Sequence, residues 1–276
     1  MSDVFKLRDL VYEETGMYFP DEKRYYFESR FQRRMEAMGH TSFLQYYQFL
    51  KIGNGRREEL YKLMSELTIN ETSFFRNAAH FTVFQNLVVP EIVKMKEGQM
   101  VKRLRIWSAG CSSGEEPYTL AMILNEMRKG ILKGWTFEIH ATDISDSILE
   151  IAKKAVYLDN AVKNMPEYYR DKYFVHTDHT WSVVDMVKRD VRFSNLNLSD
   201  DMAMVFQKGF DVILCKNVLI YFSLDSKKRV LQHFFNNLNS GGYLFVGFSE
   251  SLFGIANRFS LIRFPGGMMY RKMVHV

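Results

Sequence analysis

Apolar side chains recur at the three- and four-residue spacing of amphipathic helices along the first part of the chain. Val4, Leu7, Leu10 and Val11 share one helical face, and Gly16 suits the end of that helix. Three similar segments follow: one from Pro20 to Gly39, one around 43–50 that ends near Gly53, and one around 60–67. Short helices this close together predict a small bundle of about 70 residues, followed by a longer helical stretch at about 81–95.

From residue 104 onward, continuous apolar runs alternate with helical segments. The runs lie at 104–109, 137–141, 210–215 and 243–248. A helical segment at 118–127 follows the first run, and another at 226–238 precedes the last. This alternation predicts a parallel sheet that is covered by helices on both faces.

The stretch 172–193 breaks the alternation. Short β-like runs at 173–174, 181–184 and 191–193 are separated by polar residues, and we expect them to form a small β insertion. The alternative is a long irregular loop. The predicted organisation is therefore a helical domain over residues 1–75 and an α/β domain over 76–276, with the insertion at about 172–193.

Composition and charge describe an ordinary globular protein. The chain has 276 residues, is 47% hydrophobic and 25% charged, and has a net charge of +5. No apolar run approaches the roughly 20 residues of a membrane span, and the start lacks the apolar core of a signal peptide, so we expect a cytoplasmic protein without membrane insertion. Cys111 and Cys215 are too few for a disulfide framework and have no zinc-like spacing, so no metal is expected. The charge favours acidic partners without requiring nucleic acid.

A turn of small residues, from Gly110 to Gly114, joins the first predicted strand to a helix. A ligand can therefore lie against bare backbone there. The same pattern resembles the nucleophile elbow of α/β hydrolases, with Ser112 as the nucleophile. His233, a candidate base for it, lies within a helical segment, and Glu115 and Glu116 would oppose an oxyanion. The hydrolase is therefore a remote alternative.

Asp143 follows the second predicted strand and comes to the same sheet edge as this turn. A carboxylate there can bind the two hydroxyl groups of a ribose, although Asp143 could instead cap the following helix. Phosphate would be repelled by Glu115 and Glu116. S-adenosylmethionine carries a ribose and positive charge but no phosphate, so methyl transfer becomes the leading hypothesis.

Polar residues at two further places could complete a site. Lys216, Asn217 and Tyr221 follow the third predicted strand, where ligands collect in open α/β sheets. The segment 70–76 links the two predicted domains, and a domain junction is a natural wall for a site. Loop polarity and interdomain packing are the alternatives for these residues.

The second predicted helix carries a basic face made by Arg30, Arg33 and Arg34, which follow the i, i+3, i+4 spacing. Such a face is most often a solvated surface. The alternative is a docking site for an acidic helix.

Several long motifs resemble the chemotaxis receptor glutamate O-methyltransferase family (CheR-type), and the resemblance covers nearly the whole chain. They are residues 67–76, 106–118, 141–144, 197–198 and 217–222. The resemblance implies an α/β, Rossmann-like S-adenosylmethionine-dependent methyltransferase domain with a small inserted β subdomain, preceded by an all-α N-terminal domain. One departure is Lys216, where the family usually has arginine, so a planar two-pronged contact is in doubt.

The resemblance also implies the site. It places S-adenosylmethionine against the turn 110–114, with Asn70, Thr72, Arg76, Gly110, Glu116, Asp143, Asn197, Leu198, Asn217 and, as a weak candidate, Lys216 around it. The implied reaction forms methyl esters on glutamates in the cytoplasmic signalling helices of chemoreceptors, during chemotaxis adaptation. Arg76 and Tyr221 would orient the acceptor carboxylate, and Arg30, Arg33 and Arg34 would dock the receptor.

Family members that bind a receptor's C-terminal pentapeptide carry a glycine-rich loop in the insertion. Residues 174–192 contain no glycine, so we predict a monomeric enzyme that works without this tether. The alternatives are another methyl acceptor and a module that binds S-adenosylmethionine without turnover.

Overall fold

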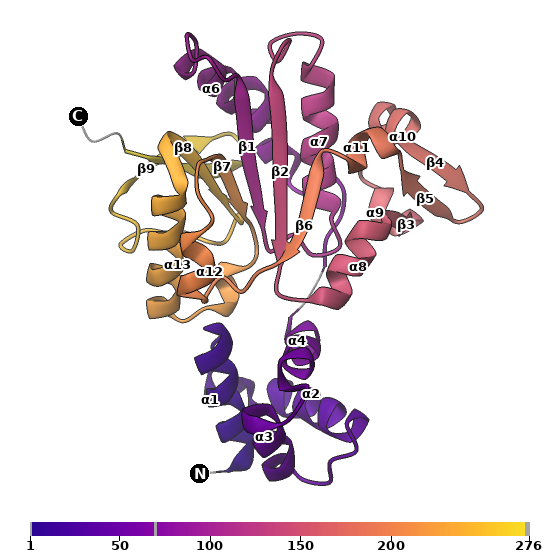
Figure 1. Cartoon of the computed structure of the whole chain (residues 1–276), viewed down its shortest axis with the longest axis vertical. Coiled ribbons are helices and arrows are strands. Elements are labelled where there is room, and N and C mark those ends of the chain that lie inside the picture. The colour runs from indigo at the N-terminus through magenta and orange to yellow at the C-terminus, as the bar shows by residue number, and fades with distance from the viewer. Residues whose placement is uncertain (1, 69–70, 274–276) are drawn as a thin grey trace.

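The computed structural model describes residues 2–68 and 71–273. The N-terminal part is a helical bundle of α1 (Asp3–Thr15), α2 (Arg24–Ala37), α3 (Phe43–Ile52) and α4 (Arg56–Leu67), with a 3₁₀ turn, η1 (Asp21–Lys23), before α2 (Figure 1). Gly16 ends α1 in the left-handed conformation, with φ of 71°, as the sequence predicted. The helices bury side chains such as Leu7, Phe27, Phe31 and Leu63. The predicted bundle is confirmed.

A second helical stretch covers one face of the sheet. It consists of α5 (Ala78–Val83), a π-helical turn η2 (Phe84–Val88) and α6 (Val89–Met95), and it matches the predicted segment 81–95. Just before it, Phe74 and Phe75 belong to the hydrophobic core of the α/β part. These two residues therefore pack with the α/β part, whereas the predicted domain boundary placed them in the helical domain.

The main sheet has seven strands in the order β6-β2-β1-β7-β8-β10-β9. Their bounds are β1 (Arg103–Ala109), β2 (Thr136–Asp143), β6 (Val191–Asn195), β7 (Phe210–Cys215), β8 (Leu238–Val246), β9 (Phe259–Phe264) and β10 (Gly267–Lys272). The strands from β6 to β8 are parallel, whereas β10 and β9 are antiparallel additions at one edge. All four predicted strands are present, and the C-terminal hairpin was not predicted.

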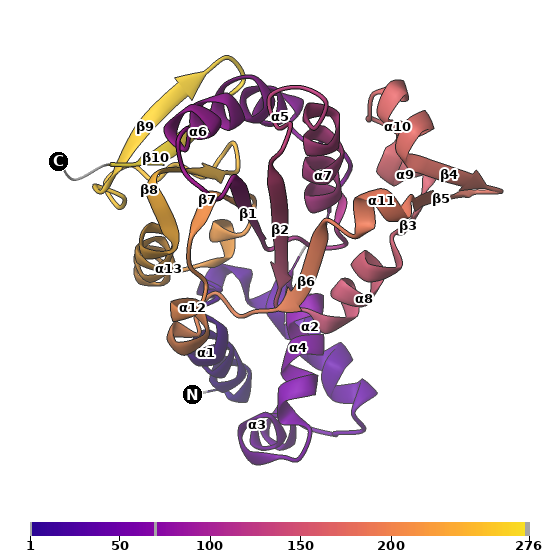
Figure 2. The same cartoon turned by 45° about the horizontal axis from the view of Figure 1, so that its top comes forward.

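Helices cover both faces of this sheet (Figure 2). They are α7 (Glu115–Met127), α8 (Asp146–Lys154), α12 (Asp201–Val205) and α13 (Leu224–Asn237), in addition to α5 and α6. Side chains of β1 alternate between the two layers. Leu104 and Ile106 join the core that includes α5 to α7, whereas Trp107 and Ala109 join the core that includes α13. This two-sided burial explains why the parallel strands read as continuous apolar runs.

The β insertion is real, but its bounds differ from the prediction of 172–193. A three-stranded antiparallel sheet in the order β3-β5-β4 forms from β3 (Val156–Leu158), β4 (Phe174–Thr177) and β5 (Thr180–Val183). Short helices accompany it: α9 (Asp159–Val162), α10 (Glu167–Tyr173) and α11 (Asp185–Lys188). The run 191–193 instead forms β6, which pairs with β2 in the main sheet. The prediction that 191–193 belongs to the insertion was therefore wrong. A short apolar run predicts a strand, but it does not indicate which strand it pairs with.

Candidate functional site

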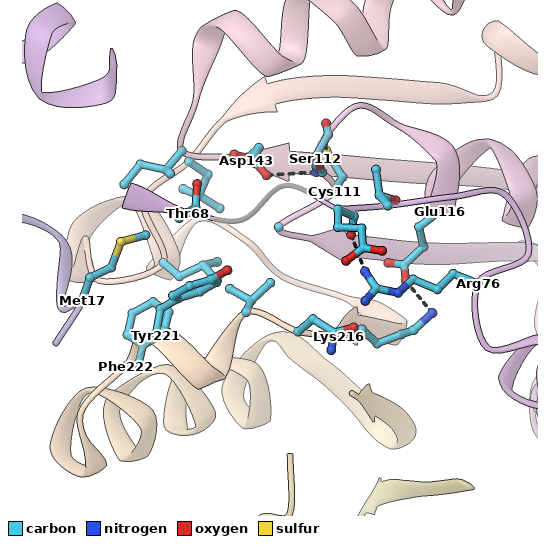
Figure 3. A pocket seen from close by; sticks show the side chains of 18 of the residues that line it. Met17, Thr68, Arg76, Cys111, Ser112, Glu116, Asp143, Lys216, Tyr221 and Phe222 are labelled. Atoms are coloured by element: carbon cyan, nitrogen blue, oxygen red, sulfur yellow. Dashed lines mark hydrogen bonds and ion pairs between the residues drawn. The ribbon is translucent and has the colours of Figure 1, made fainter. Parts of the chain in front are cut away.

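A cavity of about 970 Å³, including its open mouth, lies between the carboxyl ends of the parallel strands and the helical domain (Figure 3). Its walls come from the end of α1, the segment after α4, and the loops that follow β1, β2, β6 and β7. A cavity of this size at the carboxyl edge of an open α/β sheet has the position and dimensions of a small-molecule site.

The turn after β1 exposes its backbone to this cavity. Gly110 has a φ of 74°, and a Cβ at this position would come within 2.3 Å of Cγ2 of Val218. The N–H groups of Gly110 and Cys111 donate to the carbonyl of Thr142, at 2.8 and 2.9 Å. Since Thr142 lies near the end of β2, the turn is fixed to the neighbouring strand. A glycine is required here by both conformation and space.

Asp143, at the end of β2, is held by the backbone on both of its oxygens. Oδ2 accepts a hydrogen bond from the N–H of Ser112 at 2.9 Å, and Oδ1 accepts one from the N–H of Ser145 at 3.0 Å (Figure 3). Burial raises the pKa of Asp143, and these backbone hydrogen bonds oppose that rise. Ser145, not Asp143, is the N-cap of α8. The carboxylate therefore has a fixed orientation at the cavity wall.

Glu116 and Lys216 form a largely buried ion pair on another side of the cavity. Nζ of Lys216 lies 2.9 Å from Oε2 of Glu116, with side-chain exposures of 5% and 15%. Ser108 donates its hydroxyl to Oε1 of the same carboxylate at 2.7 Å. The lysine ammonium also lies 4.8 Å from the ring centroid of Phe81. Lys216 thus makes a point-charge contact with Glu116, in place of the planar, two-pronged contact that a guanidinium could make.

The segment after α4 supplies a further wall. Arg76 lines the cavity and donates a hydrogen bond to the carbonyl of Glu71. A hydrogen bond from the side chain of Thr72 lowers the pKa of buried Glu115, against the larger effect of burial, which raises it. Asn70 lies outside the described residues. Figure 3 shows Arg76 beside Glu116 and Lys216, with Tyr221 on the opposite side of the cavity.

The helical domain is tied directly to two loops of the site. Nδ2 of Asn197 donates to the carbonyl of Glu14 at 2.7 Å. The N–H of Tyr18 donates to the carbonyl of Tyr221 at 2.8 Å. The amide group of Asn197 therefore holds the end of α1 against the loop after β6, next to the cavity.

The cavity brings together ten of the residues that were predicted to form the catalytic and cofactor site. They are Thr72, Arg76, Gly110, Glu116, Asp143, Asn197, Leu198, Lys216, Asn217 and Tyr221. Sequence reasoning missed the apolar walls Met17, Phe81 and Leu196. Met17 forms an isolated β-bridge with Phe222, and its position just after a helix-ending glycine gave no signal of a ligand contact.

The basic face of α2 is only partly available to a partner. Arg34 makes a two-pronged contact with Glu59, which is 2% exposed, at 2.5 and 2.9 Å. Arg30 donates to the backbone carbonyls of Tyr26 and Glu66. Arg33 is 61% exposed and lies 3.5 Å from the carboxylate of Glu66. Arg30 and Arg34 therefore contact their own domain, and docking of a partner by Arg30, Arg33 and Arg34 stays a prediction.

The hydrolase alternative is not supported by the geometry. The buried Oγ of Ser112 has no hydrogen-bond partner within residues 2–68 and 71–273, so no described base activates it. His233 instead contacts Asp201 at 2.8 Å. Within the same described ranges, no cluster of three or more His, Cys, Asp or Glu side chains could hold a metal, and no helix has the length and apolar character to cross a membrane.

Comparison with known families shows which family the chain belongs to. The model of the CheR methyltransferase SAM-binding domain matches residues 70–267, and that of the CheR methyltransferase all-alpha domain matches residues 2–68. The chain belongs to the CheR methyltransferase family. The two matches meet at the segment that joins the helical bundle to the α/β part, so the CheR family accounts for both domains.

Relatives in the CheR family align over almost the whole chain. "Chemotaxis protein methyltransferase 2" of Vibrio cholerae is 36% identical over 272 residues, which are 98% of this chain and 93% of the relative. "Chemotaxis protein methyltransferase 1" of Pseudomonas aeruginosa is 36% identical and covers 97% of both chains. "Chemotaxis protein methyltransferase" of Borreliella burgdorferi is 34% identical over 92% of this chain and 90% of its own.

The cofactor of this CheR-family methyltransferase is S-adenosylmethionine. The residues around the cavity fit it chemically. Carboxylates of Asp143 and Glu116 suit a ligand with hydroxyl groups and positive charge, the backbone at Gly110 leaves room for close approach, and the buried hydroxyl of Ser112 offers an unused donor.

Proposed function

We propose that this enzyme methylates specific glutamate side chains on the cytoplasmic signalling helices of chemoreceptors, and so serves adaptation in chemotaxis. The relatives named above are chemotaxis protein methyltransferases, which supports the pathway. The observation that carries the choice of a carboxylate acceptor is the position of Arg76, a cation on the cavity wall close to Glu116 and Lys216 (Figure 3).

The cofactor-binding roles follow from the chemistry of each wall. Asp143 would accept the ribose hydroxyls, because its carboxylate is fixed by two backbone N–H groups and still has free lone pairs. Glu116 would attract the positive end of the cofactor, with Thr72, Asn197, Asn217 and the turn at Gly110 around it. Asn70 and Leu198 complete the proposed set.

When bound, the cofactor supplies a methyl group on a positively charged sulfur, which departs as a neutral thioether. The acceptor glutamate is already ionised at neutral pH, so its oxygen can form the new C–O bond without a general base. Arg76 would hold this carboxylate by hydrogen bonds, and Tyr221 would donate another from the opposite wall. The main contribution of the protein is then to place the acceptor oxygen in line with the methyl group.

Receptor docking is proposed to involve the helical domain, with Arg33 as its most available guanidinium on α2. We also propose that no pentapeptide tether is used. The β4 and β5 strands are joined by Asp178 and His179 alone, which leaves no extended loop between them. The enzyme would then be a monomer that meets the methylation region of its receptor directly.

The test is methyl transfer from labelled S-adenosylmethionine to a chemoreceptor cytoplasmic fragment, read as base-labile methanol. Arg76→Ala should lower turnover at least a hundredfold because it removes a charge-assisted contact to the acceptor. Arg33→Ala, outside the cavity, is the control for receptor docking and should mainly raise KM. Transfer to a receptor fragment whose glutamates are all replaced by glutamine would contradict the proposed acceptor.

A further inference from the structure

Glu250 is a buried carboxylate that lies outside the cavity and accepts hydrogen bonds from backbone groups of the surrounding loops. Glu250 is 6% exposed. Oε2 accepts hydrogen bonds from the N–H groups of Asn217 at 2.8 Å and Gly247 at 2.6 Å. Oε1 accepts one from the N–H of Ile220 at 3.0 Å. Three N–H donors from two loops therefore converge on one carboxylate.

Two of these donors, the N–H groups of Asn217 and Ile220, belong to the loop after β7, which carries much of the site. Lys216, Asn217, Val218 and Tyr221 of this loop all line the cavity. Asn217 has a φ of 62°, a left-handed conformation that a side chain rarely adopts without support. The hydrogen bond from its N–H to Glu250 is one such support.

The loop after β8 is shaped to bring Glu250 to this position. The N–H of Glu250 donates to the carbonyl of Gly247 at 2.9 Å, which closes a turn. A Cβ at Gly247 would come within 2.6 Å of Oε2 of Glu250 and 3.0 Å of the N of Asn217. Glycine at this position therefore leaves the space that the carboxylate needs.

The negative charge of the Glu250 carboxylate stabilises these contacts, because all three of its partners are hydrogen-bond donors. Within the described parts of the chain, Glu250 has no ion pair with a lysine, arginine or histidine. Hydrogen bonds from several N–H groups stabilise a carboxylate strongly, whereas an amide would present its own NH₂ donors to one of these N–H groups. Removing the carboxylate would also leave buried N–H groups unpaired.

We propose that Glu250 is a positioning residue, which holds the loop of residues 216–221 in the conformation that binds the cofactor. Through this loop it sets the place of Lys216 beside Glu116 and the place of Val218 against Gly110. The proposal rests on S-adenosylmethionine binding and does not depend on which acceptor is methylated.

The experiment measures S-adenosylhomocysteine affinity by calorimetry in the full-length protein, well below the melting temperature of every variant. Glu250→Gln should weaken the affinity at least tenfold while circular dichroism stays native. Asp211→Asn is the matched control. Asp211 is 2% exposed and is the second residue of β7, at the end of the strand away from the cavity. It accepts hydrogen bonds from Lys96, Asn239 and the N–H of Arg105.

A control with a similar loss of melting temperature but unchanged affinity would support the proposal. Affinity within twofold of the original in folded Glu250→Gln would overturn it, as would an equal loss in Asp211→Asn. If Glu250→Gln does not fold, Glu250→Asp decides, because it keeps the charge and shortens the side chain by one methylene. A loss of threefold or more in folded Glu250→Asp supports the positioning role, and a smaller change overturns it.

Discussion

His80 is predicted to make the α/β domain sensitive to mild acid. The residue is 1% exposed, and neither ring nitrogen has a hydrogen-bond partner in the described residues. Its ring lies in an aromatic surrounding, with centroid distances of 5.6 Å to Phe245 and 5.5 Å to Phe264. Burial, together with the charge of Lys216, lowers the pKa of His80 to about 4 from its usual 6.5. Glu116 opposes this shift but does not cancel it.

The sign and size of the effect follow from proton linkage. Above pH 6.5 the ring is neutral in both folded and unfolded chains, so His80 has no effect on the free energy of unfolding. Between pH 6.5 and 4 only the unfolded chain takes up the proton, and stability falls as the pH falls. A shift from 6.5 to about 4 corresponds to a loss of about 1.4 kcal/mol at pH 5.5 and about 2.5 kcal/mol at pH 4.5.

The measurement is urea unfolding of the original protein and His80→Leu at pH 4.5, 5.5, 6.5 and 7.5. Fluorescence of the buried Trp107 and Trp135 reports on the α/β domain. The difference at pH 7.5 gives the packing cost of the substitution, and other titrating groups cancel when the two proteins are compared. The original protein should lose about 2 to 3 kcal/mol more than the variant between pH 7.5 and 4.5. Parallel curves, with a change below about 0.5 kcal/mol, would refute the reasoning, because His80 would then take up protons equally in both states.

Three other substitutions test separate parts of the structure. Asp143→Ala should weaken S-adenosylhomocysteine binding by about 1.5 to 3 kcal/mol in calorimetry, and unchanged affinity would remove this carboxylate from the site. Arg34→Ala should lower the free energy of unfolding by about 3 kcal/mol because its carboxylate partner stays buried, whereas Arg33→Ala should change it by less than about 0.5 kcal/mol. Equal urea midpoints for those two variants would contradict the different contributions of Arg34 and Arg33 to stability. Gly110→Ala should both destabilise the fold by at least about 1 kcal/mol and reduce cofactor affinity, since its Cβ would meet Val218, and normal binding would show that the turn can move.

The sequence predicted which residues line the cavity wherever these residues lie at strand ends. The turn at 110–114, Asp143 and Lys216 each follow an apolar run, and the carboxyl ends of parallel strands meet at one edge of a sheet. Their positions in the chain therefore imply their proximity. Arg76 was suggested instead by the position of its segment between two differently patterned regions, and it also lines the cavity.

Features that depend on distant partners could not be predicted in this way. Arg34 looked like a surface residue because its buried partner, Glu59, lies 25 residues further along the chain. The run 191–193 looked like part of the insertion because a strand's own residues do not specify its neighbour. Glu250 lies in a loop where an isolated acidic residue is usually exposed, and two of its three N–H donors come from residues 30 and 33 positions away.

The contact between the segment after α1 and the loop after β7 has a consequence for how the two domains stay together. Met17 and Phe222 meet in a β-bridge at the cavity wall, so a ligand that fills the cavity touches both domains at once. Ligand binding then also stabilises the association of the two domains. The helical bundle and the α/β domain should melt more nearly as a single unit when the cavity is filled, and exchange of spent cofactor should be coupled to a transient loosening of the contact between them.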